Sequence, residues 1–488
     1  VLRYASAPQV TVLEGAVSSQ FDATKGDLRL NYDHDGLARV RISGGGRRPL
    51  LLLLADEDQG TSFWQQETAA GSVLQRGPAL VRTATVKGGR VFLTGDTSTA
   101  VPLEIWAPAS VRSGSWNGQS VALQRTRSGS MLSRAPLSGP VNFALPGLTN
   151  WRSAAGSPEA QPGFDDSGWI TASGATNTAT VRPPDGQPNL GMDAYGFHHG
   201  DVWYRGRFQG EAQAQRLTIH YGGGAVSVLQ LWLDGRFIGQ HELAGGLPRP
   251  ITTGVATFDL PAEARGSGEH VLSVMIRNNG HNWDLDADEF HKETRGLVSA
   301  SIESRTGGGF AVPIAWKIQG NSGGEEIADP VRGIVNNGGL FGERNGWHLP
   351  GFDDSRWVAT TLASARPQAG TSWLRTGFDL NVPKGQDATI GIAFGDTSKP
   401  RSDRQYRVLM FVNGWNMGQF IAHVGPQRVF PIPEGILNHR GPNTLALAVT
   451  SDGNPANTIE EVRLVTMRNV KGGLPVGMVP APATPAAK

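Results

Sequence analysis

An eight-residue stretch that occurs twice constrains this chain more than any other feature. The sequence Pro-Gly-Phe-Asp-Asp-Ser-Gly-Trp occupies residues 162–169, and residues 350–357 repeat it with one change, Gly168 to Arg356. A repeat at a separation of 188 residues, the size of a domain, predicts that one type of domain occurs twice in the second half. Each copy is typical of a tight turn that Asp side chains close onto backbone N–H groups, with Phe and Trp anchored in a core. The octet therefore predicts a scaffold.

Other landmarks recur around the octet in the same order. Asp234-Gly235 and Asn413-Gly414 each separate two apolar runs, which is a β-hairpin signal. The remaining pairs are 203–205 with 373–375, 258–261 with 430–433, and 271–276 with 445–449. We therefore predict two related jelly-roll sandwiches at residues 148–305 and 306–470, the second with a preceding crossover.

Length and composition indicate an all-β protein with several cores. A chain of 488 residues is too long for one core, and its 65 Gly and 31 Pro suit many short strands joined by turns. The net charge of +1 offers no electrostatic reason to expect nucleic acid or an anionic membrane as a partner. The absence of Cys excludes disulfides and leaves the compartment open. The densest apolar run, residues 50–55, is far too short to span a membrane.

The first part of the chain predicts an N-terminal strand and one β-sandwich over residues 1–127. Alternating apolar residues on both sides of the turn at 33–36 predict a hairpin. The uninterrupted leucines at 50–54 predict a central strand buried on both faces. Residues 128–147, rich in Ser and Pro, are interpreted as a linker, and 471–488 as a flexible Pro/Ala tail. Because the chain starts with neither Met nor a signal peptide, we expect a piece of a longer protein.

Three adjacent acid pairs invite comparison with glycosidase active sites. They are 165–166, 353–354 and 460–461. A retaining glycosidase needs two carboxyl groups about 5 Å apart across a sugar cleft. Neighbouring residues on a strand point to opposite faces, so these pairs are predicted not to be catalytic. Residues 320–324 match the Gly-x-Ser-x-Gly nucleophile elbow, but Pro330 and Gly333 follow where the elbow needs a helix, which favours a loop.

Metal sites have only weak support in the sequence. Asp284, Asp286 and Asp288 alternate in a way that could gather carboxylates around calcium. The loop fails the EF-hand pattern, with Glu289 where Gly is needed and Arg295 where the bidentate Glu should stand, so a solvated or interface loop is favoured. The adjacent histidines 198 and 199 should diverge on a strand and not share a metal. No metal ligand and no cofactor is therefore assigned.

Three tryptophans are candidates for contact with a sugar. Trp232, Trp283 and Trp415 lie on or beside predicted hairpins and loops, where an exposed indole could stack on a pyranose. Large aromatic side chains are mostly buried, so cores or interdomain seams are the competing interpretation for each of them. The sequence leaves both roles, sugar binding and interface packing, open.

Several longer motifs resemble the C-terminal region of family 35 glycoside hydrolases, the large β-galactosidases. The motifs are residues 316–321, 324–325, 331–333, 337–344, 346–350, 425–427 and 430–438, with looser agreement at 54–57, 63–64, 80–82 and 195–206. In that family two catalytic glutamates lie on an N-terminal TIM barrel, and nothing in this sequence is similar to the barrel. A barrel needs about 250 residues of alternating strand and helix, which this β-rich chain cannot provide. No catalytic residue can therefore be carried over.

The resemblance implies that the two jelly rolls have a galactose-binding-like architecture. It also implies that the chain is the accessory half of a β-galactosidase, which hydrolyses terminal β-D-galactosides as a complete enzyme. The expected partners are the catalytic barrel and, through the complete enzyme, a galactoside. The chain alone is predicted to be inactive, and the resemblance favours a periplasmic or extracellular location. The alternatives are a free-standing, lectin-like carbohydrate-binding protein and a pure assembly part whose exposed apolar seam marks the missing barrel.

Overall fold

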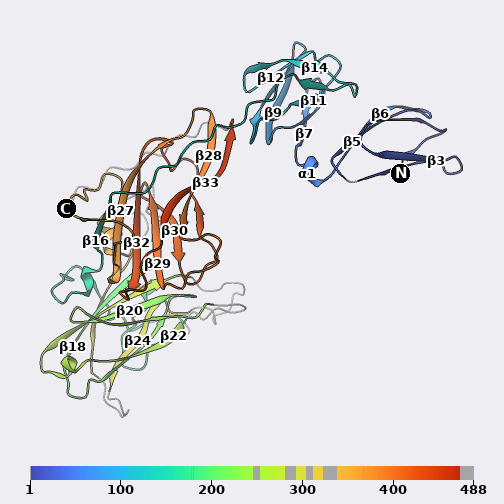
Figure 1. The fold of residues 1–488 in the computed structure, drawn as a ribbon. Coiled ribbons are helices and arrows are strands. Elements are labelled where there is room, and N and C mark those ends of the chain that lie inside the picture. Colours follow the sequence, from blue (N-terminus) through green and yellow to red (C-terminus); the bar gives the residue numbers. More distant parts are fainter. Residues whose placement is uncertain are drawn as a thin grey trace. The chain divides into compact units, whose positions relative to one another are not determined.

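Nearly all regular structure in the computed structural model is β-strand (Figure 1). The structure describes residues 2–33, 35–176, 179, 181–245, 253–280, 293–303, 312–321, 338–366 and 368–472. They form two compact units: unit 1 comprises residues 1–144, 381–389 and 466–476, and unit 2 the remainder. None of the helices in the described ranges is both long enough and apolar enough to cross a membrane. The all-β prediction is confirmed.

Unit 1 begins with two small sheets that share one core. Their strand orders are β1-β4-β3 and β2-β5-β6. The strands are β1 (Leu2–Arg3), β2 (Gln9–Glu14), β3 (Val17–Asp22), β4 (Asp27–Tyr32), β5 (Leu37–Gly44) and β6 (Arg47–Ala55). Tyr4, Leu28, Val40 and Ile42 are buried between them. The predicted hairpin is wrong, because β4 and β5 lie in different sheets. An alternation of apolar and polar residues shows that a strand has one buried face, but it does not show which strand is its neighbour.

Strand β6 corrects a second prediction. It is the edge of its sheet, with β5 as its neighbour, and not a central strand. None of its five leucines, residues 50–54, is buried, and Leu50 is 36% exposed. A long apolar edge strand is a template for pairing with another chain unless something covers it. Leu52 packs against the core of these two sheets, whereas Leu50 is exposed on the open strand.

A second sandwich in unit 1 has its own core. Its sheets have the orders β13-β12-β10-β9 and β14-β15-β11-β8-β7, preceded by the short helix α1 (Glu57–Gly60). The strands are β7 (Phe63–Thr68), β8 (Gly71–Arg76), β9 (Leu80–Lys87), β10 (Arg90–Asp96), β11 (Glu104–Trp106), β12 (Ser113–Trp116), β13 (Gln119–Val121), β14 (Leu123–Arg125) and β15 (Met131–Ser133). Residues 1–127 thus contain two cores where one was predicted. Met131 and Leu137, within the stretch 128–147 that was interpreted as a linker, pack into this core.

Unit 2 holds two sandwiches of the same design, each pairing a six-stranded sheet with a three-stranded one, although residues 381–389 and 466–471 of the second sandwich belong to unit 1. The first has β17-β25-β18-β23-β20-β21 over β22-β19-β24, and the second has β26-β16-β27-β32-β29-β30 over β31-β28-β33 (Figure 1). The first half contributes β16 (Trp151–Ala155), β17 (Ile170–Thr171), β18 (Gly200–Gln209), β19 (Arg216–Gly222), β20 (Val228–Leu233), β21 (Arg236–Glu242), β22 (Thr253–Asp259), β23 (Glu269–Asn278) and β24 (Gly296–Glu303). The second contributes β25 (Ala315–Gln319), β26 (Val358–Thr360), β27 (Ala369–Asn381), β28 (Gln386–Phe394), β29 (Tyr406–Val412), β30 (Trp415–Ile421), β31 (Val429–Pro431), β32 (Arg440–Asp452) and β33 (Val462–Lys471). The short helices are η1 (Pro158–Ala160), η2 (Met192–Tyr195), η3 (Ala262–Arg265) and α2 (Phe341–Arg344).

The two sandwiches exchange one strand each. Strand β16 precedes the first octet but pairs with β27 of the second sandwich, with Ser153 opposite Leu374. Strand β25 precedes the second octet but pairs with β18 of the first sandwich, with Ile318 opposite Tyr204. Each six-stranded sheet is therefore complete only with a strand from the other half. The boundaries 148–305 and 306–470 remain a proposal about the sequence repeat.

Both hairpin turns predicted from the repeat are confirmed. Asp234-Gly235 joins β20 to β21, and Asn413-Gly414 joins β29 to β30. The backbone φ angles are 48° and 84° in the first turn and again 48° and 84° in the second. Two successive positive φ angles are typical of the tight turns whose twist suits antiparallel strands, and they favour Asn or Asp followed by Gly.

Candidate functional site

The acid pair of the first octet serves the scaffold. Asp165 accepts a hydrogen bond from the backbone N–H of Ser167 at 2.9 Å, as predicted for the turn. Asp166 is buried, and its carboxylate lies 2.7 Å from Arg205 Nε and 2.7 Å from Arg207 Nη2. Burial raises the pKa of Asp166, but the hydrogen bonds from Arg205 and Arg207 outweigh it, and the pKa is lowered. A carboxylate held ionised in this way is a poor proton donor.

The guanidinium of Arg205 explains why the octet carries an aromatic residue. Arg205 is fully buried, and it donates through Nη1 to the carbonyl oxygens of Glu159 and Gln161, the latter at 2.9 Å. Its charged carbon lies 5.6 Å from the ring centroid of Phe164. Strand β18 thus supplies one cation that ties the whole turn to the sheet.

The second octet repeats these contacts. Asp353 accepts from Ser355 N at 2.9 Å, and Asp354 lies 3.0 Å from Nε of Arg375 on β27. Arg375 also donates to the carbonyl oxygens of residues 347 and 349 and lies 5.4 Å from the ring centroid of Phe352. Asp354 is more accessible than Asp166, with 27% of its side chain exposed against 6%. Both acid pairs therefore hold turns.

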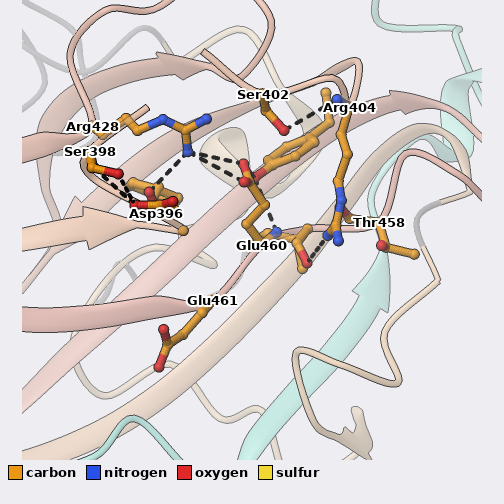
Figure 2. A network of polar contacts seen from close by, with 12 residues as sticks. Asp396, Ser398, Ser402, Arg404, Arg428, Thr458, Glu460 and Glu461 are labelled. Carbon is orange, nitrogen blue, oxygen red and sulfur yellow. Dashed lines mark hydrogen bonds and ion pairs between the residues drawn. The ribbon is translucent and has the colours of Figure 1, made fainter. Parts of the chain in front are cut away.

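The third acid pair belongs to a polar network in the second sandwich (Figure 2). Glu460 lies 3.3 Å from Arg428 Nη1 and accepts a hydrogen bond from the Tyr406 hydroxyl at 3.1 Å. Figure 2 shows Glu461 pointing away from this network, as expected for neighbouring residues. Arg404 donates to the carbonyl oxygen of Thr458 at 2.9 Å and fixes the same segment. Burial raises the pKa of Tyr406 beyond its ordinary range, so its hydroxyl stays protonated and serves as a donor.

Trp232 is enclosed where the two sandwiches of unit 2 meet. Its side chain is 3% exposed and stacks on Trp203 with ring centroids 5.3 Å apart. A Cβ atom added at Gly370 of the second sandwich would lie 3.2 Å from the Trp232 ring. A ring covered on this scale has no free face for a sugar. Of the two roles predicted for Trp232, this geometry is compatible with interface packing.

The other predicted site residues are less completely defined. Trp415 begins β30 beside the Asn413-Gly414 turn and is half-buried. Trp283 and the calcium candidates Asp284, Asp286 and Asp288 lie outside the described residues, as does most of the 320–324 motif. His198 contacts Asp193, whereas His199 contacts Asn321, so the two rings have different partners. Among the residues the structure describes, no group of three His, Cys, Asp or Glu side chains could hold a metal.

Sequence reasoning missed a set of charges between the two sandwiches. Arg407 of β29 lies 2.5 Å from Glu242 of β21, and it donates to the carbonyl oxygen of Val226 at 2.9 Å. His423 Nε2 lies 2.8 Å from the same carboxylate. Burial raises the pKa of Glu242, but His423 and Arg407 outweigh it, and the pKa is lowered. No sequence signal could have found this group, because its members lie on different halves of the chain.

A second missed group surrounds Glu343 in helix α2. The Glu343 carboxylate accepts hydrogen bonds from the backbone N–H groups of Gly338 at 2.9 Å and Leu340 at 3.2 Å. Burial, with a contribution from nearby Asp201, raises the pKa of Glu343 to about 7. Asp201 is itself held by Arg277 of β23, 2.5 Å away. The carboxylate of Glu343 closes a helix start, so its high pKa has a structural explanation that needs no substrate.

Two protein-family models match three stretches of the chain. The description "Beta-galactosidase second all-beta domain" matches residues 164–282 and again residues 341–455, once for each sandwich of unit 2. The description "Beta-galactosidase, domain 3" matches residues 56–132, the second sandwich of unit 1. The double match agrees with the repeat predicted from the octet.

Two similar curated proteins are both described as probable β-galactosidases. The chain is 36% identical over 457 residues to "Probable beta-galactosidase B" of Aspergillus fumigatus, a match that covers 89% of this chain and 43% of that protein. It is 32% identical over 479 residues to "Probable beta-galactosidase C" of Neosartorya fischeri, covering 95% and 45%. A family 2 glycosyl hydrolase from Bacteroides cellulosilyticus, a solved structure, matches 66% of this chain and 34% of its own at 11% identity, but its TM-score of 0.19 carries no argument. The chain spans less than half the length of these curated relatives.

Proposed function

This chain belongs to the family 35 β-galactosidases, as their all-β C-terminal region, and we propose on that premise that it is the accessory half of an enzyme that hydrolyses terminal β-D-galactosides. Its role is to pack against a catalytic barrel and stabilise it, and hydrolysis is the work of the complete enzyme. The curated relatives are more than twice as long as the region that matches this chain. The remainder of each relative is therefore long enough for such a barrel.

One observation carries the proposal: in each acid pair that could have suggested glycosidase chemistry, at least one carboxylate is paired with an arginine that holds the fold. Asp166 and Asp354 pair with Arg205 and Arg375, and Glu460 pairs with Arg428. A glycosidase needs one carboxyl group with a raised pKa facing a second across an open cleft. The buried Glu343 has the raised pKa, but both of its oxygens accept backbone N–H groups.

The leucine edge of β6 is the surface we assign to the catalytic half. Its leucines at 50–54 are at least partly exposed on a strand with one open side, which supports contact with another part of the complete enzyme. A partner there would pair with the open backbone edge and cover the apolar side chains. The other edge of the same sheet, β2, carries Val12 at 41% exposure and provides a matched control.

Co-expression with the part of the Aspergillus fumigatus relative that lies outside the matched region, where the barrel is expected, tests this proposal. We expect the chain to co-purify with the barrel and to lengthen the half-life of its activity on a chromogenic galactoside during heating. Leu50→Lys, which places a charge on the open edge, should weaken both effects, whereas Val12→Lys on the opposite edge should preserve them. Equal half-lives with and without the chain, or equal effects of the two variants, would contradict the proposal.

A further inference from the structure

A cleft in unit 1 is lined by several positively charged residues, which the accessory role does not explain. It has a volume of about 700 Å³, within the usual range for small-ligand sites. One wall is formed by strands β9, β10, β12 and β13 with residues 134–138, and the other by residues 384–385 and 471–472. Trp232 and Trp415, the predicted site residues that the structure describes, do not line it.

The charges of the cleft have one sign. Among the residues that the structure describes, its lining includes Arg82, Arg134, Lys384 and Lys471 and no acidic residue. Arg82 is neutralised by Asp96, which is fully buried and lies 2.5 Å from it. Arg134, Lys384 and Lys471 are exposed, and none of them forms an ion pair with another described residue. In a chain with a net charge of only +1, this is a local concentration of positive charge that attracts an anion.

Backbone contacts fix the wall that carries the two lysines. Lys471 and Thr97 exchange N–H···O bonds of 2.9 and 3.0 Å, and Gly472 donates to the carbonyl oxygen of Gly385 at 3.0 Å. The approach at Gly472 is so close that a Cβ atom there would lie 2.3 Å from the carbonyl oxygen of Gly95. Lys384 and Lys471 therefore project from fixed backbone, which lowers the entropy lost when they bind a ligand.

The opposite wall adds neutral polar groups beside an aromatic ring. The amide of Asn117 is committed to Gly95, with hydrogen bonds of 2.9 and 2.8 Å that hold the wall in place. Gln119 is exposed and can donate and accept, and Trp116 reaches the lining with 8% of its surface accessible. Cations, an amide and an indole edge together suit a ligand with both negative groups and hydroxyl groups.

We propose that this cleft binds an anionic saccharide, a short chain of sugars that carry carboxylates. The preference for an anion follows from the cleft itself, whereas the choice of a saccharide rests on the proposed function. Lys384, Lys471 and Arg134 would contact the carboxylates, and Gln119 the hydroxyl groups. Such a site would hold acidic polysaccharide near the complete enzyme without taking part in hydrolysis.

Titration calorimetry with tetragalacturonate, and with neutral β-1,4-galactotetraose as its uncharged counterpart, tests the proposal. We expect the chain to bind tetragalacturonate at low salt and to lose affinity as the salt concentration rises. The double variant Lys384→Gln/Lys471→Gln should weaken binding by at least about tenfold, because it removes two charge-assisted contacts. The matched double variant Lys87→Gln/Lys399→Gln removes two exposed lysines outside the cleft and should leave affinity within about twofold.

Several results would overturn the proposal. They are the absence of tetragalacturonate binding, equal affinity for the neutral tetrasaccharide, and equal losses in the two double variants. Displacement by inorganic sulfate at a concentration matched in carboxylate equivalents would also overturn it, because the cleft would then hold only a simple anion. None of these results bears on whether the chain associates with a barrel through the β6 edge, so the two proposals fail separately.

Discussion

Replacing Asp166 with alanine should lower the free energy of unfolding of unit 2 by about 3–5 kcal/mol, the usual result of leaving a buried charge without its partner. Arg205 is fully buried and would keep only uncharged acceptors, namely backbone carbonyl oxygens and the hydroxyl of Ser273. Arg207 is 28% exposed and can turn to solvent. Urea unfolding followed by tryptophan fluorescence measures the change.

The sequence repeat provides matched controls for that measurement. Asp354→Ala should cost less, about 1.5–3 kcal/mol, because the Asp354 side chain is 27% exposed and water can replace part of its interaction with Arg375. Asp165→Ala removes an exposed turn contact and should change stability little. Equal costs for Asp166→Ala and Asp165→Ala would contradict the account of the octet.

The difference between wild type and Asp166→Ala should also depend on pH. The pKa of Asp166 is lower in the folded state than in the unfolded chain. Its contribution to stability is therefore present above the unfolded pKa and is lost as the pH falls through the folded pKa. The two unfolding curves should converge in acid and separate fully near neutral pH.

Expressed separately, the two halves of unit 2 should fail to fold, which is the second large effect we expect. Residues 145–305 include β16, which pairs in the second sandwich, and they lack β25, which lies between β17 and β18 in the first. Residues 306–472 have the complementary defect. Each fragment would leave a gap inside a sheet and expose the backbone of two strands. Co-expression should restore one complex with the melting behaviour of the intact unit.

A proline substitution tests the strand exchange in the intact chain. Ser153→Pro introduces a proline into β16, between β26 and β27, where it should cost about 3 kcal/mol or more. Hydrogen exchange should then increase in β27 and β32 of the second sandwich and remain slow in β18 and β23 of the first. Cooperative melting of either fragment alone, or loss of protection confined to the first sandwich, would contradict the exchange.

The parts of the fold that the sequence predicted correctly depend on local chemistry. The turns at Asp234-Gly235 and Asn413-Gly414 follow from residues that tolerate positive φ, and Asp165 closes its turn through a neighbour two positions away. The repeat predicted that the two sandwiches are related, because similar sequences form similar contacts. Each of the turn signals lies within a few residues of the chain and needs no distant partner.

The parts it missed depend on partners far along the chain. Alternation in β4 and β5 gave no indication that they lie in different sheets, and the leucines of β6 look the same in a central strand as on an open edge. The octet gave no sign that β16 and β25 exchange sheets. The ion pair between Arg407 and Glu242 joins residues on different halves, and the lysines of the cleft in unit 1 come from different segments. Such contacts exist only once the sheets are assembled.

The most direct test of the central claim is an assay of the purified chain, without any partner, on a chromogenic β-galactoside. The chain is expected to give no hydrolysis above the uncatalysed rate, because Asp166, Asp354 and Glu460 are paired with arginines and Glu343 closes a helix start. Asp166→Asn, Glu343→Gln and Glu460→Gln variants, assayed in parallel, identify the source of any turnover. Hydrolysis by the pure chain that one of these substitutions abolishes would contradict the claim that catalysis belongs to another part of the enzyme.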